Sequence, residues 1–156
     1  MIIRQAKKSD IPAMVGLLEE LFAIEDDFVI DSMKQMNGLK LLLEMPDSVA
    51  FVVQIDNHII AMATVQKFVS TAMGDYVGLI EDVVVTKAYR AQGIGKKLLH
   101  ALIDECHKRG MKRLALGADQ RNQSAIEFYQ KLGFKPSNMG FLYYFMFKDG
   151  VYYPVV

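Results

Sequence analysis

The chain has 156 residues, close to the ~150 of a typical domain, so we expect residues 1–156 to form one compact domain. Its 18 lysines and arginines balance its 18 aspartates and glutamates, which argues against binding of nucleic acid or of a membrane surface through a broad cationic excess. Hydrophobic residues make up 52% of the chain and charged residues 23%, a composition typical of a globular protein.

Three further features narrow the class of protein. The longest unbroken apolar run, residues 141–147, is far shorter than the ~18 residues of a membrane span. Residues 1–5 show no cationic start leading into an apolar stretch, so we expect no secretion signal and a cytoplasmic location. A single cysteine, Cys106, excludes an internal disulfide framework. The sequence also lacks a spaced His/Cys cluster of the kind that indicates a metal site.

The N-terminal part of the chain predicts one strand and two helices. Residues 2–6 are typical of a short strand, and apolar residues at three- and four-residue steps predict a helix over residues 10–22. The pair Glu19-Glu20 is expected to face outward on this helix. A second helix is expected over residues 31–43, where Asn37-Gly38 is a candidate break.

The middle of the chain predicts three strands. Residues 49–55 and 59–68 flank the two-residue turn Asp56-Asn57 and should pair as a hairpin. A third strand over residues 79–86 contains Val83–Val85, which is too continuously apolar for a half-exposed strand. We therefore expect it to be buried on both faces and central in the sheet.

The C-terminal part predicts two helices around a short strand, and then a hairpin. The helices are expected over residues 93–109 and 123–132, the strand over 113–117, and the hairpin from strands 141–147 and 151–155. The second of these helices is expected to bury Ala125, Phe128, Tyr129 and Leu132. This order predicts an α/β fold, with a mixed, mostly antiparallel central sheet and helices on both faces.

The turn between the third strand and the following helix carries chemistry. A loop at a helix N-terminus presents unpaired N–H groups and the positive end of the helix dipole, which favours phosphate, and Lys87 to Lys97 contains four basic residues and no acid. Gly93-x-Gly95 lacks the third small residue of a dinucleotide-binding motif, because Leu98 stands there, and the Walker pattern is absent too. Taken alone, this spacing fits an ordinary strand-to-helix turn equally well.

The whole segment is more informative. Arg90-x-x-Gly93-x-Gly95 resembles the R/Q-x-x-G-x-G/A signature of the GNAT superfamily of N-acetyltransferases. Asn-Gln-Ser-Ala-Ile-Glu-Phe-Tyr-Gln-Lys-Leu-Gly-Phe, over residues 122–134, resembles that family's second conserved block. The two motifs occur in the family's order and spacing. The resemblance implies a GNAT-like acyl-CoA N-acyltransferase fold and an enzyme that passes the acetyl group of acetyl-CoA directly to a primary amine.

The resemblance also implies roles for individual positions. The backbone of the Val83–Val85 strand pairs with the pantetheine arm, the loop N–H groups hold the pyrophosphate, and Asn122 contacts the arm. Tyr129 matches a tyrosine near the thioester sulfur that often protonates the departing thiolate, and Glu81 matches a general base used in some members. The residues implied to bind acetyl-CoA are Val83, Val84, Val85, Arg90, Ala91, Gln92, Gly93, Ile94, Gly95, Lys96, Asn122 and Tyr129.

A base has a clear task in such a reaction. A lysine-like amine with a pKa of ~10.4 must lose a proton before it attacks, which costs ~4 to 5 kcal/mol at neutral pH. A positioned carboxylate supplies about 10² to 10⁴ in rate, which is comparable to that cost. A thiol with a pKa near ~8.5 leaves more easily, so its protonation by Tyr129 should contribute less.

Structural alternatives remain for these residues. Glu81 and Asp82 also fit an ordinary pair of exposed charges. Alternation along the strand places their side chains on opposite faces of the sheet, and the role expected for Asp82 is structural. Tyr129 lies on the apolar stripe of its helix and fits a core position, and Asn122 fits a helix cap. Cys106 is expected to pack in the core and not to act as a nucleophile.

An acidic stretch precedes the second helix. Residues 9–33 contain seven acids and no basic residue, and Glu25, Asp26 and Asp27 lie at its centre. This is either a solvated helix face or, because the first helices of the family border the acceptor site, an acidic rim. Such a rim favours a cationic acceptor, either a small molecule such as a polyamine or an aminoglycoside-like compound, or a lysine or peptide amine.

The aromatic C-terminal hairpin has two interpretations as well: a homodimer contact, or strands buried on both sides. Two other classes of function compete with the enzyme. One is a module that binds CoA or acyl-CoA without turnover, and the other is a regulatory protein whose partner binds the aromatic hairpin. No nucleic-acid or membrane partner is expected.

Overall fold

The computed structural model describes residues 1–25 and 28–146. Its strands and helices follow in the order β1 (Ile2–Gln5), α1 (Ile11–Phe22), α2 (Ser32–Glu44), β2 (Val49–Ile55), β3 (His58–Ser70), β4 (Asp75–Val85), α3 (Ile94–Lys108), β5 (Leu114–Leu116) and α4 (Gln123–Lys131). Short 3₁₀ turns precede α1 and α3, over Lys8–Asp10 and Lys87–Tyr89.

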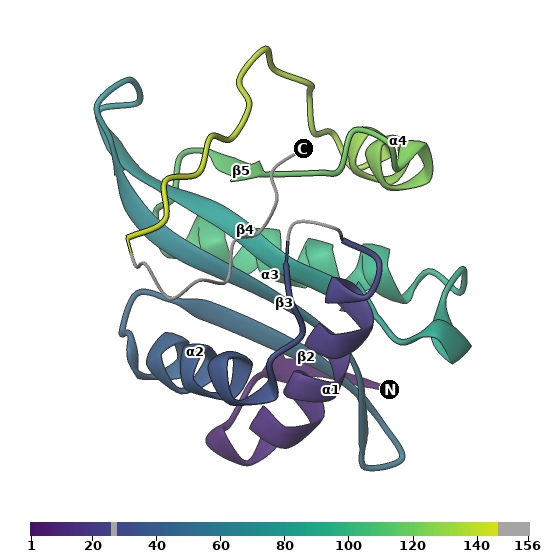
Figure 1. The fold of residues 1–156 in the computed structure, drawn as a ribbon. Coiled ribbons are helices and arrows are strands. Elements are labelled where there is room, and N and C mark those ends of the chain that lie inside the picture. Colours follow the sequence, from purple (N-terminus) through teal and green to yellow (C-terminus); the bar gives the residue numbers. More distant parts are fainter. Residues whose placement is uncertain (26–27, 147–156) are drawn as a thin grey trace.

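The five strands form one sheet in the order β1-β2-β3-β4-β5. The first four strands pair antiparallel, whereas β5 runs parallel to β4. Helices α1 and α2 lie on one face of the sheet and α3 lies on the other (Figure 1). The predicted fold class, a mixed and mostly antiparallel sheet with helices on both faces, is confirmed.

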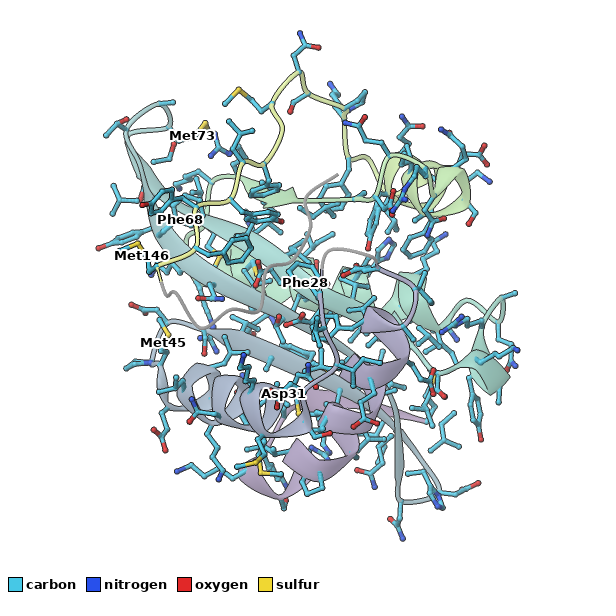
Figure 2. The ribbon with its side chains drawn as sticks, in the orientation of Figure 1. Phe28, Asp31, Met45, Phe68, Met73 and Met146 are labelled. Carbon is cyan, nitrogen blue, oxygen red and sulfur yellow. The ribbon has the colours of Figure 1, made fainter. Side chains whose placement is uncertain are left out.

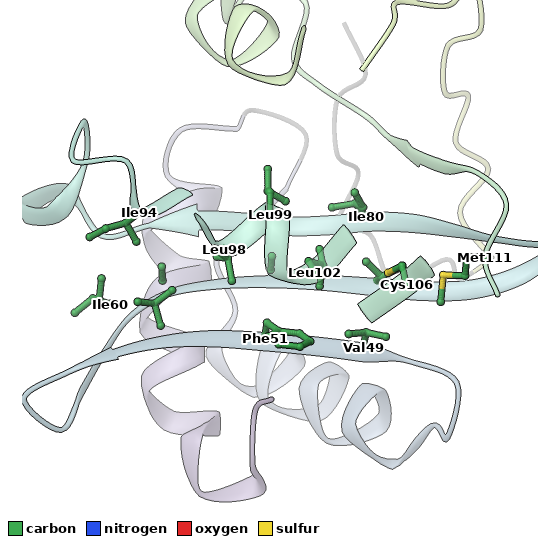
Figure 3. Packing of buried hydrophobic residues seen from close by; sticks show 14 residues of the cluster. Val49, Phe51, Ile60, Ile80, Ile94, Leu98, Leu99, Leu102, Cys106 and Met111 are labelled. Carbon is green, nitrogen blue, oxygen red and sulfur yellow. The ribbon is translucent and has the colours of Figure 1, made fainter. Parts of the chain in front are cut away.

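Alternation along the strands divides the apolar residues between two core layers. On one face, Val52 and Met62 pack under α1 and α2 and are fully buried. On the other face, Val53 and Ala63 meet α3 together with Phe51 (Figure 3). The residues that α3 buries in this layer are Ile94, Leu98, Leu99, Leu102 and Cys106.

Cys106 is buried among these apolar side chains, as predicted. Burial raises the pKa of its thiol to about 11, because the surrounding side chains disfavour the thiolate. A thiol that stays protonated at neutral pH is a poor nucleophile, so packing is the role that this environment supports.

The hairpin between β2 and β3 is confirmed at the predicted turn. Asp56 and Asn57 have φ angles of 45° and 63°, the left-handed conformation that tight hairpin turns require. The candidate helix break at Asn37-Gly38 is not a break, since α2 runs through it. Gly38 lies on the exposed side of that helix, while buried Leu39 and Leu42 hold the other side against α1.

Two predictions about strands need correction. Val84 is buried, but Val83 and Val85 are only half-buried, and β4 lies next to the edge strand β5. The predicted strand over residues 141–147 is wrong for residues 141–146, which form no strand. Their aromatic rings pack against one another and against the α1 side instead of joining a ladder. Its partner strand, 151–155, lies outside the described residues.

No helix in the part of the chain that the structure describes has the length and apolar character needed to span a bilayer.

Two glycine substitutions should change stability in opposite directions. A Cβ on Gly78, where β4 pairs with β5, would lie 2.7 Å from both Leu114 Cδ2 and Val65 Cγ1, so Gly78→Ala should lower the free energy of unfolding by about 1–3 kcal/mol. A Cβ on Gly38 meets nothing within 4 Å, so Gly38→Ala should raise it by about 0.5–1 kcal/mol. Denaturant unfolding of both variants checks this, and a Gly78→Ala protein as stable as the parent chain would contradict the tight β4–β5 contact.

Candidate active site

A bulge in β4 shapes the centre of the candidate site. Met62 pairs with Val84 and Thr64 with Glu81, so two β4 residues, Asp82 and Val83, face a single residue of β3. Asp82 takes a left-handed conformation, with φ at 55°, which aspartate tolerates better than most residues. The Thr64 hydroxyl donates to Glu81 O (3.0 Å) and to Asp82 Oδ2 (3.2 Å).

Beyond the bulge β4 has an open edge. It pairs with β5 only from Gly78 to Ile80, and the described residues place no strand beside Val83–Val85 on the side away from β3. An extended arm with amide groups can lie along such an edge as a further strand. Among the backbone groups of Val83–Val85, the carbonyl oxygen of Val85 already accepts a hydrogen bond from Arg90 Nε (2.8 Å).

The loop after β4 presents unpaired N–H groups. Gly93 and Ala91 have φ angles of 77° and 60°, which turn this part of the backbone back on itself before α3. The first bond of α3 runs from Lys97 N to Gly93 O, and among the described residues no protein group accepts from the N–H groups of residues 91–96. These donors, the helix dipole and the nearby basic side chains suit a pyrophosphate.

The first turn of α3 lies close to α4 and to the end of β4, at a distance that a Cβ on Gly95 would fill with ordinary van der Waals contacts. A Cβ on Gly95 would lie 3.4 Å from Phe128 Cζ and 3.6 Å from Val85 Cγ2. The loop, the open edge of β4 and α4 therefore meet at this point.

Glu20, at the end of α1, fastens the start of the same loop. Its carboxylate accepts from the Thr86 hydroxyl (2.6 Å) and from the Lys87 N–H (3.2 Å), and it pairs with the Arg90 guanidinium at 3.5 Å. The sequence placed Glu20 on an outward face. The structure shows that this face contacts the loop, and no local pattern indicates it, because the partners lie 66 residues or more along the chain.

A cavity of about 840 Å³ opens beside the bulge. Glu81 and Asp82 both line it, so the expectation that they lie on opposite faces of the sheet is wrong: the bulge interrupts the alternation. Glu25 lines the cavity as well, whereas Asp26 and Asp27 lie outside the described residues. The other lining residues are Leu21, Phe22, Phe28, Leu79, Ile80, Gly117, Ala118, Asp119, Gln120, Arg121, Phe141 and Tyr143.

Asp82 is the acid that the sequence treated as structural and that the geometry brings into the site. Burial raises the pKa of its carboxyl to about 6, and the neighbouring negative charge of Glu81 adds to this, while the Thr64 hydrogen bond opposes it. A carboxyl with a pKa near the working pH is suited to proton transfer. Only the preference of aspartate for left-handed backbone hinted at this position in the sequence.

Tyr129 lies on α4, with its ring 5.3 Å from that of Phe128 and 5.9 Å from that of Phe134, between ring centroids. Burial raises the pKa of the Tyr129 hydroxyl to about 12, and the negative charge of Glu25 contributes. Tyr129 therefore keeps its proton at neutral pH. It is not among the residues that line the cavity.

The expected burial of α4 needs correction, because Ala125, Phe128, Tyr129 and Leu132 are half-buried. Helix α4 lies beyond β5 at the edge of the sheet, so the sheet covers only part of its apolar face (Figure 1). The alternative role of Asn122 as a helix cap is confirmed, since its Oδ1 accepts from Ala125 N at 3.1 Å.

In residues 1–25 and 28–146, no three His, Cys, Asp or Glu side chains are arranged to hold a metal ion.

The Asp82→Asn variant should show the energetic cost of the buried carboxylate. Since the native pKa of about 6 lies above the ordinary value of 3.8, ionisation of Asp82 destabilises the fold increasingly as the pH rises through this range. We therefore compare the free energy of unfolding of the variant with that of the parent chain at each pH. The advantage of the variant should be about 2 kcal/mol larger at pH 7.5 than at pH 4.5. Denaturant unfolding at the two pH values checks this.

Asp56→Asn is a matched control, because Asp56 has the same left-handed conformation but lies exposed in a turn. It should give the same small change at both pH values. An equal response of the two variants to pH would contradict the burial of Asp82.

Comparison with known proteins decides the family. The profile of the Acetyltransferase (GNAT) family matches residues 17–134, which include the bulge, the loop and α4. The chain belongs to the GNAT acetyltransferase family. The resemblance on the two motifs is thereby confirmed.

Individual relatives agree with this. N-alpha-acetyltransferase 30 of Schizosaccharomyces pombe is 34% identical over 76 residues, which are 49% of this chain and 51% of that protein. The [ribosomal protein bS18]-alanine N-acetyltransferase of Escherichia coli (strain K12) is 40% identical over 40% of this chain and 43% of that protein, so these matches span about half the length of the two relatives, or less. A transcriptional regulator from Bacillus halodurans C-125 superposes with a TM-score of 0.82 at 26% identity, over 92% of this chain and 99% of that chain.

A CoA complex is found among the solved structures of this fold. An aminoglycoside N-acetyltransferase in complex with CoA has a TM-score of 0.79 and 20% identity, over 93% of this chain and 94% of that chain. At this identity the likeness concerns the fold. GNAT acetyltransferases use acetyl-CoA or CoA, and the open edge and the loop described above fit such a ligand.

Proposed function

We propose that this GNAT acetyltransferase is an N-acetyltransferase that moves the acetyl group of acetyl-CoA to a primary amine. The observation that carries the proposal is that three features lie next to one another. They are a loop suited to an anion, the open edge of β4 beside it, and a carboxylate-lined cavity at the bulge where that edge begins. The loop suits a pyrophosphate, the edge an amide-bearing arm, and the cavity an ammonium group.

In this proposal the coenzyme lies between β4 and α4. The backbone of Val83–Val85 pairs with the pantetheine arm, and the N–H groups of residues 91–96 hold the pyrophosphate. Asn122 contacts the arm in addition to capping α4. Arg90 is engaged by Val85 and Glu20, so its proposed role is to shape the loop beside the phosphates.

The proposed reaction forms a C–N bond and breaks the C–S bond of the thioester. Glu81, exposed at the cavity wall, takes a proton from the acceptor ammonium, which frees the lone pair for attack. The Tyr129 hydroxyl, protonated at neutral pH, gives its proton to the departing thiolate, and the second proton that the nitrogen loses restores this hydroxyl. The products are free CoA, an N-acetyl amine and the one proton that Glu81 took, which passes to water.

Asp82 is a second candidate for the base. It lines the same cavity, and its pKa of about 6 lies closer to neutral pH than that of an ordinary carboxyl. If Asp82 takes the proton, kcat/KM should fall below an apparent pKa near 6, and this inflection should vanish in Asp82→Asn. An unchanged pH profile in Asp82→Asn would leave Glu81 as the base.

A panel of primary amines tests the proposed function. The protein is mixed with acetyl-CoA and each amine, thiol release is followed, and the product mass is measured. Equal amounts of thiol and of a product heavier by one acetyl group support the proposal. Binding of acetyl-CoA without turnover of any amine supports a CoA-binding module instead.

Glu20→Gln should weaken acetyl-CoA binding without slowing the chemical step. The amide loses the charge that pairs with Arg90 and one of the acceptor oxygens at the loop, so the KM for acetyl-CoA should rise about 3- to 10-fold while kcat stays within about twofold. Steady-state kinetics check this. Glu19→Gln is the control, because Glu19 accepts from Ser32 at the start of α2 and does not contact the loop. An equal rise in both variants would count against the role of Glu20.

A further inference from the structure

One wall of the cavity is aromatic. The ring of Phe28 lies 5.4 Å from that of Phe22 on α1 and 6.5 Å from that of Tyr143, between centroids, so it bridges α1 and the C-terminal segment (Figure 2). Phe141 stacks on Tyr143, with centroids 6.3 Å apart and planes 8° from parallel. These four residues, called the aromatic wall, all line the cavity.

The aromatic wall is held in place but is not buried. Phe141 lies directly over Gly117, where a Cβ would come within 2.8 Å of its ring, so the segment is anchored at the end of β5. Nevertheless Phe28 is 43% exposed, Phe141 60% and Tyr143 49%. Large rings with this exposure beside a cavity are typical of a surface that contacts a ligand.

The carboxylates of the same cavity mark where a cation would lie. Glu81 and Asp82 come from the bulge and Glu25 from the chain after α1. Asp119 contributes little further negative charge, because Arg121 Nη2 and Nε bind its carboxylate at 2.7 Å and 3.0 Å. The cavity thus offers two carboxylates at the bulge, and rings together with Glu25 at the α1 side.

We infer that the acceptor is a primary amine joined to an aromatic or similarly bulky apolar group, and this inference rests on the proposed function. The ammonium group lies at Glu81 and Asp82, and the apolar group lies against the aromatic wall. A polyamine or a polyol does not fit as well, since its further amines or hydroxyls would lose water against rings that offer no hydrogen-bond partner except the Tyr143 hydroxyl.

A comparison of three amines tests the inference. Phenethylamine, ethylamine and spermidine all carry primary amines with pKa values of ~10, and only the first carries a ring. We expect kcat/KM for phenethylamine to exceed that for each of the other two by at least about tenfold. Equal or better turnover of spermidine or ethylamine would overturn the inference.

Two variants test whether the preference for phenethylamine depends on the aromatic wall. Phe28→Ala should lower kcat/KM for phenethylamine about tenfold and leave that for ethylamine within about twofold, because only the ring contact is lost. Leu142→Ala is the control, since Leu142 lies in the same segment but is 98% exposed and does not line the cavity. A similar loss in both variants, or the same loss for both amines in Phe28→Ala, would contradict the role of the aromatic wall.

The experiments distinguish an error in the inferred acceptor from an error in the proposed function. If ethylamine or spermidine is acetylated and phenethylamine is not preferred, the N-acetyltransferase stands and the apolar acceptor is wrong. If thermal unfolding shows acetyl-CoA binding and no amine is acetylated, the proposed function is wrong and the inference falls with it.

Discussion

Glu81→Gln is expected to lower kcat for a primary amine with a pKa near ~10 by about 10²- to 10⁴-fold, while the KM for acetyl-CoA stays within about twofold. Glutamine keeps the size and the exposed position of the side chain at the cavity wall but cannot take a proton. Because the reaction of such an amine requires loss of a proton, the whole effect should appear in the catalytic step. Steady-state kinetics at pH 7.5 measure it.

The pKa of the amine provides the internal control. An amine with a pKa near ~7 is already half deprotonated at neutral pH, so it needs less help and the variant should slow its acetylation much less. Glu44→Gln is a matched variant at a glutamate that pairs with Lys8 and lies outside the cavity, and it should behave as the parent chain does. Full activity of Glu81→Gln with the high-pKa amine would assign the proton to Asp82 or to water.

Tyr129→Phe is expected to lower kcat about 10- to 100-fold, less than Glu81→Gln, because a thiolate leaves more easily than a high-pKa ammonium loses its proton. The ring contacts with Phe128 and Phe134 remain in the variant, so its thermal stability should change little. Single-turnover kinetics separate the catalytic step from product release.

The pH dependence makes the Tyr129 assignment more specific. With a pKa of about 12, the hydroxyl is protonated throughout the range in which the enzyme is measured, so it should produce no loss of rate up to pH 9. Tyr76→Phe, at an exposed tyrosine outside the cavity, is the control. If Tyr129→Phe has the same kcat as this control, the thiolate leaves without a proton from Tyr129.

Local patterns predicted most of the fold. The three- and four-residue apolar spacing gave α1 and α3, and the two-residue turn at Asp56-Asn57 gave the β2–β3 hairpin. Such features depend on neighbours in the sequence. The same spacing predicted α4 but overstated its burial, because burial depends on how far the sheet extends, and β5 has only three residues.

The parts of the site that the sequence missed depend on long-range geometry. The bulge at Asp82 arises from the register between β3 and β4, so strand alternation predicted the wrong face for one member of the carboxylate pair. The contacts of Glu20 join α1 to a loop more than 60 residues away. The aromatic run 141–146 looked like a strand, but its rings pack with Phe28 and with one another.

The loop of the first motif, by contrast, was predicted from its resemblance to the GNAT signature, because the residues that carry this resemblance lie close together in the sequence. The glycine with positive φ, the unpaired N–H groups and the helix start lie within residues 91–97. The cavity has no such signature, because its lining residues come from α1 and the chain after it, from β4, from the chain after β5 and from the C-terminal segment.

Thermal unfolding with and without acetyl-CoA tests the central claim most directly, namely that the loop and the open edge of β4 bind this ligand. A ligand at about 100 times its Kd adds about 2.7 kcal/mol to the free energy of unfolding, which for a domain of this size raises the Tm by several degrees. We expect such a rise with acetyl-CoA and with free CoA. An unchanged Tm with both would mean that the loop binds no pyrophosphate, and would contradict the proposed function.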